Sequence, residues 1–354
     1  MKTQITPLKL ARYPELLTGK PRPIHWDIDP SSVCDHRCQG CPYIFDGPVD
    51  PMLGVVRPES AKDKRTFLDY ARLIHFFDEA KALGCKAITF VGGGEPTLHP
   101  RITEILRAAH ERKIKFGIVT HLGRDYSGEF FDAASNATWI RVSVNAGTQE
   151  TYEDHQGRDD FDRAIANAEL LAKQGPRVGL SFLVTPKNYD EAALATQIAK
   201  AAGCAYIQFK PMISPDLAKI YAGCEVEIRD NLDAALEYAD DSFQVLDQFV
   251  SRLAELERHD LKEFSGKCWV PWFNPKLGAN GVVYTCCELA YSNEGKIGSI
   301  YEEPLESILE RAGDGCMEMS ACPHCWDKSV NTIINEGRLG GVIPPPASVD
   351  QEFV

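Results

Sequence analysis

Residues 25–41 read HWDIDPSSVCDHRCQGC, a short run suited to a β-strand followed by a loop that carries three cysteines. The strand candidate covers residues 25–29, and Cys34, Cys38 and Cys41 follow it in a C-x3-C-x2-C pattern. Thiolates are the usual protein ligands of a [4Fe–4S] cluster, and four of them occupy all four irons. Three thiolates leave one iron open, as a catalytic metal site requires. The pattern therefore predicts a catalytic cluster at the end of a strand.

Zinc is the alternative metal for cysteines at this spacing. Zinc sites usually combine two Cys-x2-4-Cys or Cys/His pairs, and no partner pair lies near this loop. The spacing of residues 34–41 therefore favours an iron–sulfur cluster over a zinc knuckle or a set of unrelated thiols.

Strand and helix candidates alternate from residue 25 to residue 212. Such alternation is typical of βαβ units that build a parallel sheet. Joined by right-handed crossovers, six units would curl into a partial barrel. We therefore expect an α/β fold, a partial (βα)6 barrel of the TIM type. The strand candidates are residues 25–29, 87–91, 116–121, 139–145, 178–185 and 206–212, and the clearest helical stretches are residues 66–83, 102–112, 161–174 and 190–202.

The alternation of side chains along each strand indicates which residues face the barrel interior. In the strand at 139–145, Arg141, Ser143 and Asn145 share one face and apolar residues share the other. The strand at 206–212 alternates in the same way, with Lys210 on its polar face. Active sites of such barrels lie at the carboxyl ends of the strands. The polar residues expected at that rim are His121, Asn145, Thr185 and Lys210.

Length and composition fit a cytoplasmic globular protein. At 354 residues the chain allows about two domains, and 44% hydrophobic with 25% charged residues is ordinary for a soluble fold. The chain shows no apolar run of about 18 residues, so we expect no membrane span. It shows no signal peptide either, so we expect its twelve cysteines to be in a reducing compartment. The net charge of −13 argues against nucleic acid and anionic membranes as partners, and is compatible with a cationic substrate such as an amino sugar.

A glycine-rich turn follows the second strand candidate, in the sequence Val91-Gly92-Gly93-Gly94-Glu95-Pro96-Thr97. It lacks the glycine spacings of P-loops and dinucleotide-binding loops. A C-x3-C-x2-C loop followed by a Gly-Gly-Glu-Pro turn resembles the radical S-adenosylmethionine (SAM) superfamily. In that family SAM chelates the open iron through its amino and carboxylate groups. The resemblance implies that Gly93, Gly94 and Glu95 line the methionine end of SAM, since glycines let a ligand approach the backbone closely.

The same resemblance implies further cofactor contacts. Ser143 is the expected contact to the SAM ribose, and Asn145 and Lys210 are expected to contact the substrate or a carboxylate. The family usually has an aromatic residue immediately before the third cysteine, where it stacks on the adenine, whereas this chain has Gly40 there. Tyr43, two residues beyond the third cysteine, would supply the ring instead.

A second set of cysteines lies toward the C-terminus. Cys268 is followed by Gly281 and, after four intervening residues, by Cys286. The Asn280-Gly281 pair is a strong hairpin signal and places Cys286 on the second strand of that hairpin. With a downstream Cys-x2-Cys pair, this pattern resembles the twitch variant of the SPASM domain of some radical SAM enzymes. The resemblance implies a second [4Fe–4S] cluster without an open site, held by Cys268, Cys286, Cys322 and Cys325.

A structural zinc held by four thiolates is the alternative for this second site. Cys287 and Cys316 each lie within a few residues of an expected ligand and would be able to replace it. Together the motifs divide the chain into a radical SAM barrel, a mostly helical and acidic connecting segment, an auxiliary-cluster domain and a C-terminal tail. These cover residues 24–213, 214–265, 266–330 and 331–354, respectively.

The resemblance implies the chemistry as well. An electron donor such as flavodoxin or ferredoxin would reduce the first cluster, and SAM would be cleaved to a 5′-deoxyadenosyl radical that abstracts hydrogen from a small-molecule substrate. The second cluster would then accept an electron from the substrate radical. We therefore expect the dehydrogenation of a small polar metabolite such as a sugar or an aminocyclitol. Lys210 or His121 would be the base that removes the hydroxyl proton.

Three alternatives remain open. Epimerisation would quench the substrate radical with a thiol, for which Cys224, Cys287 and Cys316 are candidates. Peptide modification is the role of many SPASM proteins, but those commonly carry an N-terminal peptide-recognition domain, and about 24 residues precede the first strand candidate here. A two-cluster electron carrier would need neither an open iron nor a barrel with a polar interior.

Overall fold

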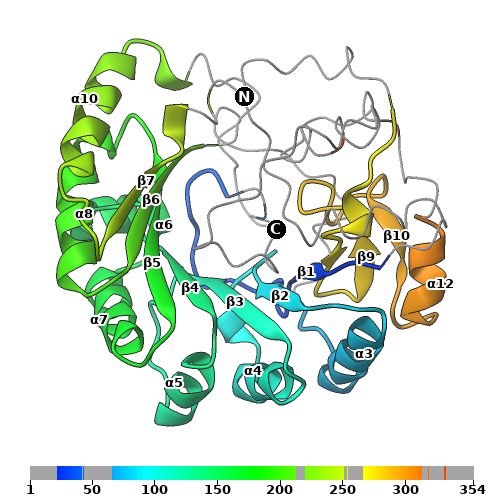
Figure 1. Cartoon of the computed structure of the whole chain (residues 1–354). Coiled ribbons are helices and arrows are strands. Elements are labelled where there is room, and N and C mark those ends of the chain that lie inside the picture. Colours follow the sequence, from blue (N-terminus) through cyan, green and yellow to red (C-terminus); the bar gives the residue numbers. More distant parts are fainter. Residues whose placement is uncertain are drawn as a thin grey trace.

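The computed structural model describes residues 22–41, 43, 66–212, 220–250, 253, 266–312, 318 and 331. Across these residues, a ten-stranded sheet organises the fold, with the strand order β10-β9-β8-β1-β2-β3-β4-β5-β6-β7. Figure 1 shows this sheet curving into an open arc, with the helices on its outer, convex side. Side chains on the concave side therefore face one another across the interior of the arc.

The strands β1 to β7 are parallel and follow one another in chain order across the sheet. This arrangement confirms the predicted α/β fold with a largely parallel sheet. Each of the six strand candidates forms a strand whose ends differ from the prediction by one or two residues at most. The strands are β1 His25–Ile28, β2 Ala87–Phe90, β3 Lys115–Thr120, β4 Trp139–Ser143, β5 Arg177–Val184, β6 Tyr206–Pro211 and β7 Gln244–Asp247.

Helices cover the apolar side chains on the outer face of the sheet. Trp26 on β1 meets Phe76 of α3 edge to face, with ring centroids 4.9 Å apart. Helix α3 begins at Tyr70 rather than at residue 66, because Asp69 caps it by accepting a hydrogen bond from the Arg72 amide at 2.8 Å. The helices are α3 Tyr70–Ala82, α4 Ile102–Glu111, α5 Gly128–Ala134, α6 Gln149–Gln156, α7 Phe161–Ala172, α8 Ala192–Ala201, α10 Glu225–Leu236 and α12 Leu305–Glu310, with short 3-10 turns η2 Pro96–Leu98, η3 Tyr189–Glu191 and η5 Val270–Trp272.

Some elements go beyond what sequence periodicity indicates. Helices α5 and α6 are short, and each begins after a hydroxyl cap, Ser127 and Thr148 respectively. The connecting segment 214–265 is predicted to be mostly helical, and its described part contains α10 and the short strand β7, which was not predicted. This strand has no fully buried residue, so it lacks an apolar face, and it is defined by its pairing with β6, where Tyr206 lies opposite Gln244.

The C-terminal strands join the barrel sheet instead of forming a sheet of their own. Strand β8 runs parallel to β1, with Asp27 opposite Lys276. Strands β9 and β10 continue the sheet in antiparallel pairs. The C-terminal region is therefore continuous with the barrel through β1, as Figure 1 shows. The bounds are β8 Lys276–Leu277, β9 Val282–Tyr284 and β10 Lys296–Ser299.

The predicted hairpin at Asn280-Gly281 forms between β8 and β9. Gly281 has a φ of +75°, a conformation that glycine adopts without strain. The position of Cys286 corrects the prediction, because β9 ends at Tyr284 and Cys286 lies two residues beyond the strand.

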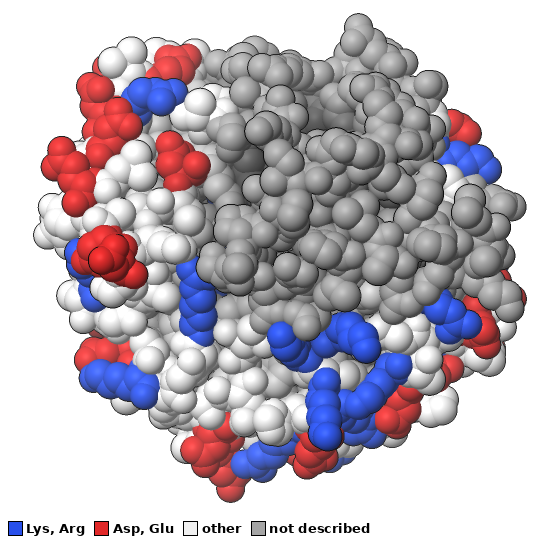
Figure 2. All heavy atoms as spheres, viewed as in Figure 1, with Lys and Arg blue, Asp and Glu red and all other residues white. Residues whose placement is uncertain are grey.

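Charged residues on the surface agree with the acidic composition. In Figure 2 acidic side chains gather on the side of the molecule where α10 lies. This helix exposes Glu225, Glu227, Asp230 and Asp233. Among the described helices, none has both the length and the apolar character that crossing a bilayer requires.

Candidate active site

The cysteines of the N-terminal motif lie on the loop that leaves the carboxyl end of β1. Cys34, Cys38 and Cys41 are half-buried and none of the three forms a disulfide. The Cys41 amide donates to the Cys38 carbonyl at 3.2 Å, closing the last turn of the loop. Burial, together with the negative charge of Glu95, raises the pKa of Cys34 to about 12. Thiolates are therefore unfavourable here unless a cation is bound, and an iron–sulfur cluster meets that requirement.

Helix α6 holds this loop through backbone hydrogen bonds at its C-terminal end. The Arg37 amide donates to the Gln156 carbonyl at 2.9 Å, and the Gln39 amide donates to the His155 carbonyl at 2.7 Å. The helix ends at Gly157, which has a φ of +70° and lies so close to the loop that an added Cβ would be 3.2 Å from Cβ of Arg37. The position of the loop thus depends on the end of α6.

The side chain of Gln156 links the cluster loop to β4. Its Nε2 donates to the carbonyls of Ser143 and Val144, at 2.8 and 3.0 Å. Its Oε1 accepts a hydrogen bond from the Cys38 thiol at 2.7 Å. Because two backbone acceptors fix the amide, the orientation of Gln156 toward Cys38 is set by the fold.

The Glu95 carboxylate organises the glycine-rich turn. It is 3% exposed and accepts four hydrogen bonds of 2.7–3.0 Å, from the amide and hydroxyl of Thr97, the hydroxyl of Thr120 and the amide of His121. The backbone amide of Glu95 donates to the Val33 carbonyl at 2.8 Å, which joins the turn to the cluster loop. The carboxylate thus has a structural role in the turn, and the predicted contact of Glu95 with SAM stays a prediction.

Two glycines of the turn are points of close approach. A Cβ on Gly94 would lie 2.4 Å from the Val33 carbonyl oxygen, and a Cβ on Gly93 would lie 2.7 Å from the ring of Tyr291. Larger residues do not fit at either position without displacing a neighbour. The turn is thus held between the cluster loop and Tyr291 of the C-terminal region.

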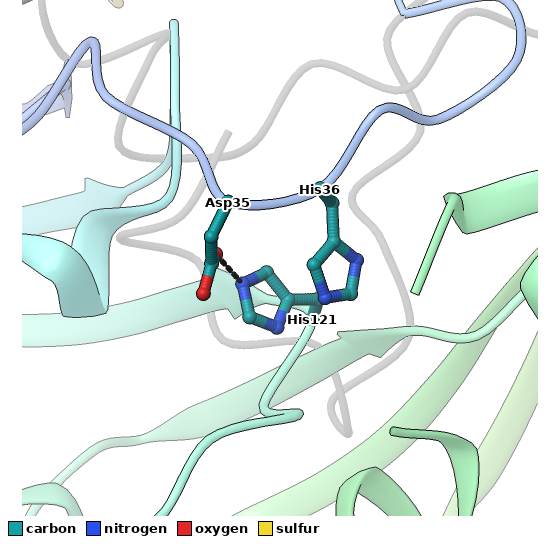
Figure 3. A group of neighbouring side chains, drawn as sticks. All are labelled: Asp35, His36 and His121. Atoms are coloured by element: carbon teal, nitrogen blue, oxygen red, sulfur yellow. Dashed lines mark hydrogen bonds and ion pairs between the residues drawn. The ribbon is translucent and has the colours of Figure 1, made fainter. Parts of the chain in front are cut away.

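Two histidine rings stack beside the cluster loop, as Figure 3 shows. The ring centroids of His36 and His121 are 3.6 Å apart and the rings are tilted by 16°. His121 donates from Nε2 to Asp35 at 2.9 Å and accepts at Nδ1 from the Gly123 amide at 3.0 Å. His36 Nε2 lies 3.2 Å from the Asp160 carboxylate. Potential ligand atoms of Asp35, His36 and His121 lie within 4.8 Å of one another, but their hydrogen bonds assign this group to positioning the loop.

These contacts bear on the prediction that His121 is a catalytic base. Burial lowers the pKa of His121 while the charges of Glu95 and Asp35 raise it, with a net upward shift. The Gly123 amide nevertheless requires an unprotonated Nδ1. Burial alone would raise the pKa of Asp35, but the hydrogen bond and charge of His121 lower it to about 2. Both ring nitrogens of His121 are thus engaged, and Lys210 lies half-buried on β6. The role of either residue as the base stays a prediction.

A buried ion pair joins the C-terminal region to the end of β1. Lys276 Nζ lies 2.6 Å from Asp29 Oδ1, and both side chains are at most 1% exposed. The Tyr291 hydroxyl donates to Asp29 Oδ2 at 2.9 Å and accepts from the Ala279 amide at 3.1 Å. Burial lowers the pKa of Lys276, but the charge of Asp29 outweighs it and raises the pKa overall. Sequence reasoning missed this group, because Lys276 has no local feature that distinguishes it from a surface lysine.

Tyr43, predicted to hold the adenine, lies between the two cysteine-bearing regions. Its hydroxyl donates to the Cys287 carbonyl at 3.2 Å. Its ring packs against Tyr291, with centroids 5.9 Å apart at 81°, and Lys276 Nζ lies 6.0 Å from the ring centroid. The role of Tyr43 toward adenine stays a prediction, and the structure adds a contact to the C-terminal region.

Other predicted site residues lie at the same rim. Ser143 ends β4 and is half-buried. Asn145 has a φ of +58°, and its side-chain oxygen accepts from the Leu183 amide at 2.8 Å. Cys224 immediately precedes α10 without forming a side-chain cap, and its thiol donates to the Tyr221 carbonyl at 3.2 Å. Asn145 therefore has a structural role, and its predicted substrate contact and that of Ser143 remain predictions.

Only part of the predicted auxiliary site can be placed. Cys268 is buried, Cys286 and Cys287 are half-buried, and none of the three forms a disulfide. Burial raises the pKa of Cys287, as does the charge of Cys286. Cys316, Cys322 and Cys325 lie outside the described residues. The second ligand set therefore stays a prediction.

Several curated proteins are similar to parts of this chain. An AdoMet-dependent heme synthase of Methanosarcina barkeri is 25% identical over 53% of this chain and 49% of its own length. A probable GTP 3′,8-cyclase of Metallosphaera sedula is 30% identical over 35% of this chain and 39% of its own length. A PqqA peptide cyclase of Ruegeria pomeroyi is 27% identical over 48% of this chain and 42% of its own length. The chain spans less than half the length of each of these relatives.

Solved structures share the fold at low sequence identity. SuiB of Streptococcus suis bound to S-adenosylmethionine matches with a TM-score of 0.60 and 18% identity, over 81% of this chain and 65% of that one. Native anSMEcpe with bound AdoMet matches with a TM-score of 0.59 and 17% identity, over 88% of each chain. A family model described as the Radical SAM superfamily matches residues 28–197. These residues, which include the cysteine loop and the glycine-rich turn, form a radical SAM superfamily domain whose cofactors are a [4Fe–4S] cluster and SAM.

Proposed function

We propose that this chain is a radical SAM enzyme that oxidises a small polar metabolite, with a second cluster in its C-terminal region as the electron acceptor. One observation carries the proposal. The loop after β1, which carries the three cysteines, lies beside the Gly-Gly-Glu turn after β2, and the two segments are joined by the 2.8 Å hydrogen bond from the Glu95 amide to the Val33 carbonyl. Both segments follow the carboxyl ends of adjacent parallel strands, where barrel enzymes carry their active sites.

The residues present fit the cofactors of this domain. Cys34, Cys38 and Cys41 would hold the cluster on a loop that the backbone carbonyls of His155 and Gln156 keep in place. When bound, the cluster and SAM would supply a radical able to take one hydrogen atom from the substrate, and a second cluster would supply an acceptor for the remaining electron. A base removes the proton of the hydroxyl group on the carbon that is oxidised. Our candidate for this base is Nζ of Lys210 on β6.

The first experiment measures iron and sulfide per chain after anaerobic reconstitution. We expect about eight irons in the wild-type protein and about four in the Cys34/Cys38/Cys41→Ala variant, since each cluster contains four irons. Reduced wild-type protein should convert SAM to 5′-deoxyadenosine, and the triple variant should not. Cys85→Ala and Cys204→Ala are matched controls, because both cysteines are buried away from either motif.

The outcomes separate the parts of the proposal. Absence of 5′-deoxyadenosine from reduced, iron-loaded wild-type protein would rule out the enzyme and favour an electron carrier. About four irons falling to none, with zinc bound at the C-terminal cysteines, would remove the electron acceptor and with it the dehydrogenation.

Epimerisation is a second candidate because a thiol lies near the rim. The Tyr221 hydroxyl donates to the Val184 carbonyl at the end of β5 and accepts from the Met212 amide just beyond β6, both at 2.8 Å. Cys224 bonds to the same tyrosine through its carbonyl. In deuterated water, an epimerase would fix solvent deuterium at carbon without net oxidation, whereas a dehydrogenase would release an oxidised product.

Peptide modification is the third candidate. One relative is a PqqA peptide cyclase, and SuiB has been solved bound to the precursor peptide SuiA. The names of the relatives cover heme, GTP and peptide chemistry, so they leave the substrate class open. Abstraction of hydrogen from a peptide rather than from a metabolite would show as deuterium transfer from a labelled peptide into 5′-deoxyadenosine.

A further inference from the structure

The inner face of the sheet has two halves that differ in their hydrogen bonding. On β1 and β2 polar side chains pair with one another, as His25 Nε2 does with the Thr89 hydroxyl at 2.8 Å. On β4 and β6 the inner face carries two long polar side chains, Arg141 and Gln208, that form no hydrogen-bonded pair within the described part of the chain. This half therefore presents polar groups that the fold itself does not use.

Strand register places these groups close together. Arg141 of β4, Gly179 of β5 and Tyr206 of β6 lie in one row across the sheet. The next inner-face row toward the carboxyl ends contains Ser181 and Gln208. Neighbouring strands are about 4.8 Å apart, and Gly179 has no side chain, so Arg141 and Tyr206 face each other across it.

The position of Tyr206 confirms this proximity. Its ring lies directly over Gly179, where an added Cβ would be 2.2 Å from the ring. Burial raises the pKa of Tyr206, and the positive charges of Arg141 and Arg177 act on it in the opposite direction. Both guanidinium groups therefore lie near the phenol. Arg177 is exposed and donates to Gln244 at 2.6 Å, whereas Arg141 is half-buried.

Arg141 is a cation without a carboxylate partner among the described residues. Its guanidinium carbon lies 5.7 Å from the ring centroid of Trp139, a contact that leaves its N–H groups available at the edge. Strands β4, β5 and β6 contain no aspartate or glutamate, so the local charge is positive although the whole chain is acidic. An arginine fork is suited to carboxylate and phosphate groups, which it binds through two parallel hydrogen bonds.

Gln208 gives independent support. It is 6% exposed, and its buried Nε2 has no hydrogen-bond partner in the described structure. Buried amide nitrogens are bonded in the large majority of cases, so an unpaired one needs an explanation. A ligand with acceptor oxygens would supply the missing partner.

We propose that Arg141, assisted by Gln208 and Tyr206, binds an anionic group of the substrate, a carboxylate or a phosphate, on the inner face of β4 to β6. The inference rests on the proposed function and specifies its substrate class. The negative net charge of the chain is compatible with a cationic substrate such as an amino sugar. The proposed site is positively charged, so we expect a substrate with an anionic group instead.

The test uses the fluorescence of Trp139, which lies beside Arg141. Full-length reconstituted protein is titrated with sodium phosphate and with sodium acetate, with and without SAM, and sodium chloride at equal ionic strength serves as the blank. The signal assigned to Trp139 is the part that Trp139→Phe removes. We expect a saturable change with one of the two anions, and the preferred anion distinguishes phosphate from carboxylate recognition.

Variants assign the binding to named groups. We expect Arg141→Met to weaken the dissociation constant about tenfold or more and Gln208→Met about threefold. Arg101→Met is the matched control, because that arginine is also stacked over a ring, that of Tyr70, but is exposed and lies at the start of α4 rather than on β4 to β6; this variant should bind the anion like wild type. Gln208→Met keeps the test valid if Arg141→Met does not fold.

Three results would overturn the inference: no saturable signal in wild type, an equal response to chloride, or unchanged affinity in both Arg141→Met and Gln208→Met. Loss of SAM binding by equilibrium dialysis would instead count against the proposed function, since the anion titration without SAM does not depend on it.

Discussion

The Glu95 carboxylate shows how one buried side chain can define a turn. The carboxylate accepts four hydrogen bonds from N–H and O–H groups. An amide in its place would point its own NH2 group at some of these donors, and those hydrogen bonds would be lost. We expect Glu95→Gln to lower the free energy of unfolding in urea by about 1–3 kcal/mol. Glu104→Gln, at an exposed pair with Arg101, should change it by less than about 0.5 kcal/mol. Equal effects of both variants would show that the four bonds do not hold the turn.

A histidine next to this turn makes stability depend on pH. His99 donates from Nε2 to the Leu68 carbonyl at 2.8 Å and accepts at Nδ1 from the Arg101 amide at 3.0 Å. Burial lowers its pKa below the usual 6.5, although the bond to Leu68 opposes the shift. The unfolded chain therefore binds the proton more readily, and stability is lost as the pH falls below 6.5.

We expect His99→Gln to reduce this dependence on pH. The difference in urea midpoint between wild type and variant should be largest near pH 8 and narrow as the pH falls below 6.5. The variant His110→Gln, at an exposed position on α4, should show the same dependence of the urea midpoint on pH as the wild type. A constant difference across the range would contradict the assignment of a neutral, buried His99.

Among the elements, α6 connects the cluster loop to the rest of the barrel. Its C-terminal end carries the backbone bonds to the loop, and its N-terminal end is fixed by Glu191. That carboxylate accepts from the Gly147 amide at 2.6 Å and from the hydroxyls of Thr148 and Thr151, each at 2.7 Å. A loosened N-terminus would therefore move the residues that hold the loop.

We expect Glu191→Gln to release cluster iron to a chelator several-fold faster than wild type, with an unchanged circular dichroism spectrum. Glu153→Gln, on the exposed side of the same helix, is the matched control and should release iron at the wild-type rate. Identical rates in all three proteins would mean that α6 does not position the loop.

The elements also show what a sequence can predict. The strands β1 to β6 are recognisable because each combines an apolar outer face with a polar or small inner face over four to eight residues. Strand β8 has only two residues, Lys276–Leu277. Strand β7 has no fully buried residue, so it lacks the apolar face that marks β1 and β2. Both exist because the edges of the barrel sheet offer unpaired backbone groups.

The candidate site, too, can be predicted from the sequence only where its features are local patterns. The cysteine spacing and the glycine-rich turn are local patterns, and each predicts its own chemistry. The partners of the turn are not local, because Tyr291 and Asp29 are 262 residues apart. No spacing rule links two such positions, so the close contact of Tyr291 with Gly93 can be recognised only in the folded structure.

Across the whole molecule, the seam between β1 and β8 depends on the buried pair of Asp29 and Lys276. Removing one partner leaves an uncompensated buried charge. We expect Lys276→Met to lower the free energy of unfolding in urea by about 3–5 kcal/mol, and Asp29→Asn/Lys276→Met to recover much of that loss. Lys173→Met, at an exposed pair with Glu169, should have little effect. A double variant as unstable as the single one would show that the loss does not come from the unpaired charge.

The same seam should affect SAM, because the ring of Tyr291 lies against Gly93 and its hydroxyl is bound to Asp29. Tyr291→Phe keeps the ring and removes the hydrogen bond that orients it. We expect this variant to retain wild-type iron content and to bind SAM several-fold more weakly in equilibrium dialysis, since the turn would lose its fixed support. Tyr301→Phe, on the exposed side of the C-terminal region, should bind SAM like wild type. Weaker binding with full iron content would mean that the C-terminal region shapes the SAM site itself, whereas unchanged binding would restrict it to the stability of the fold.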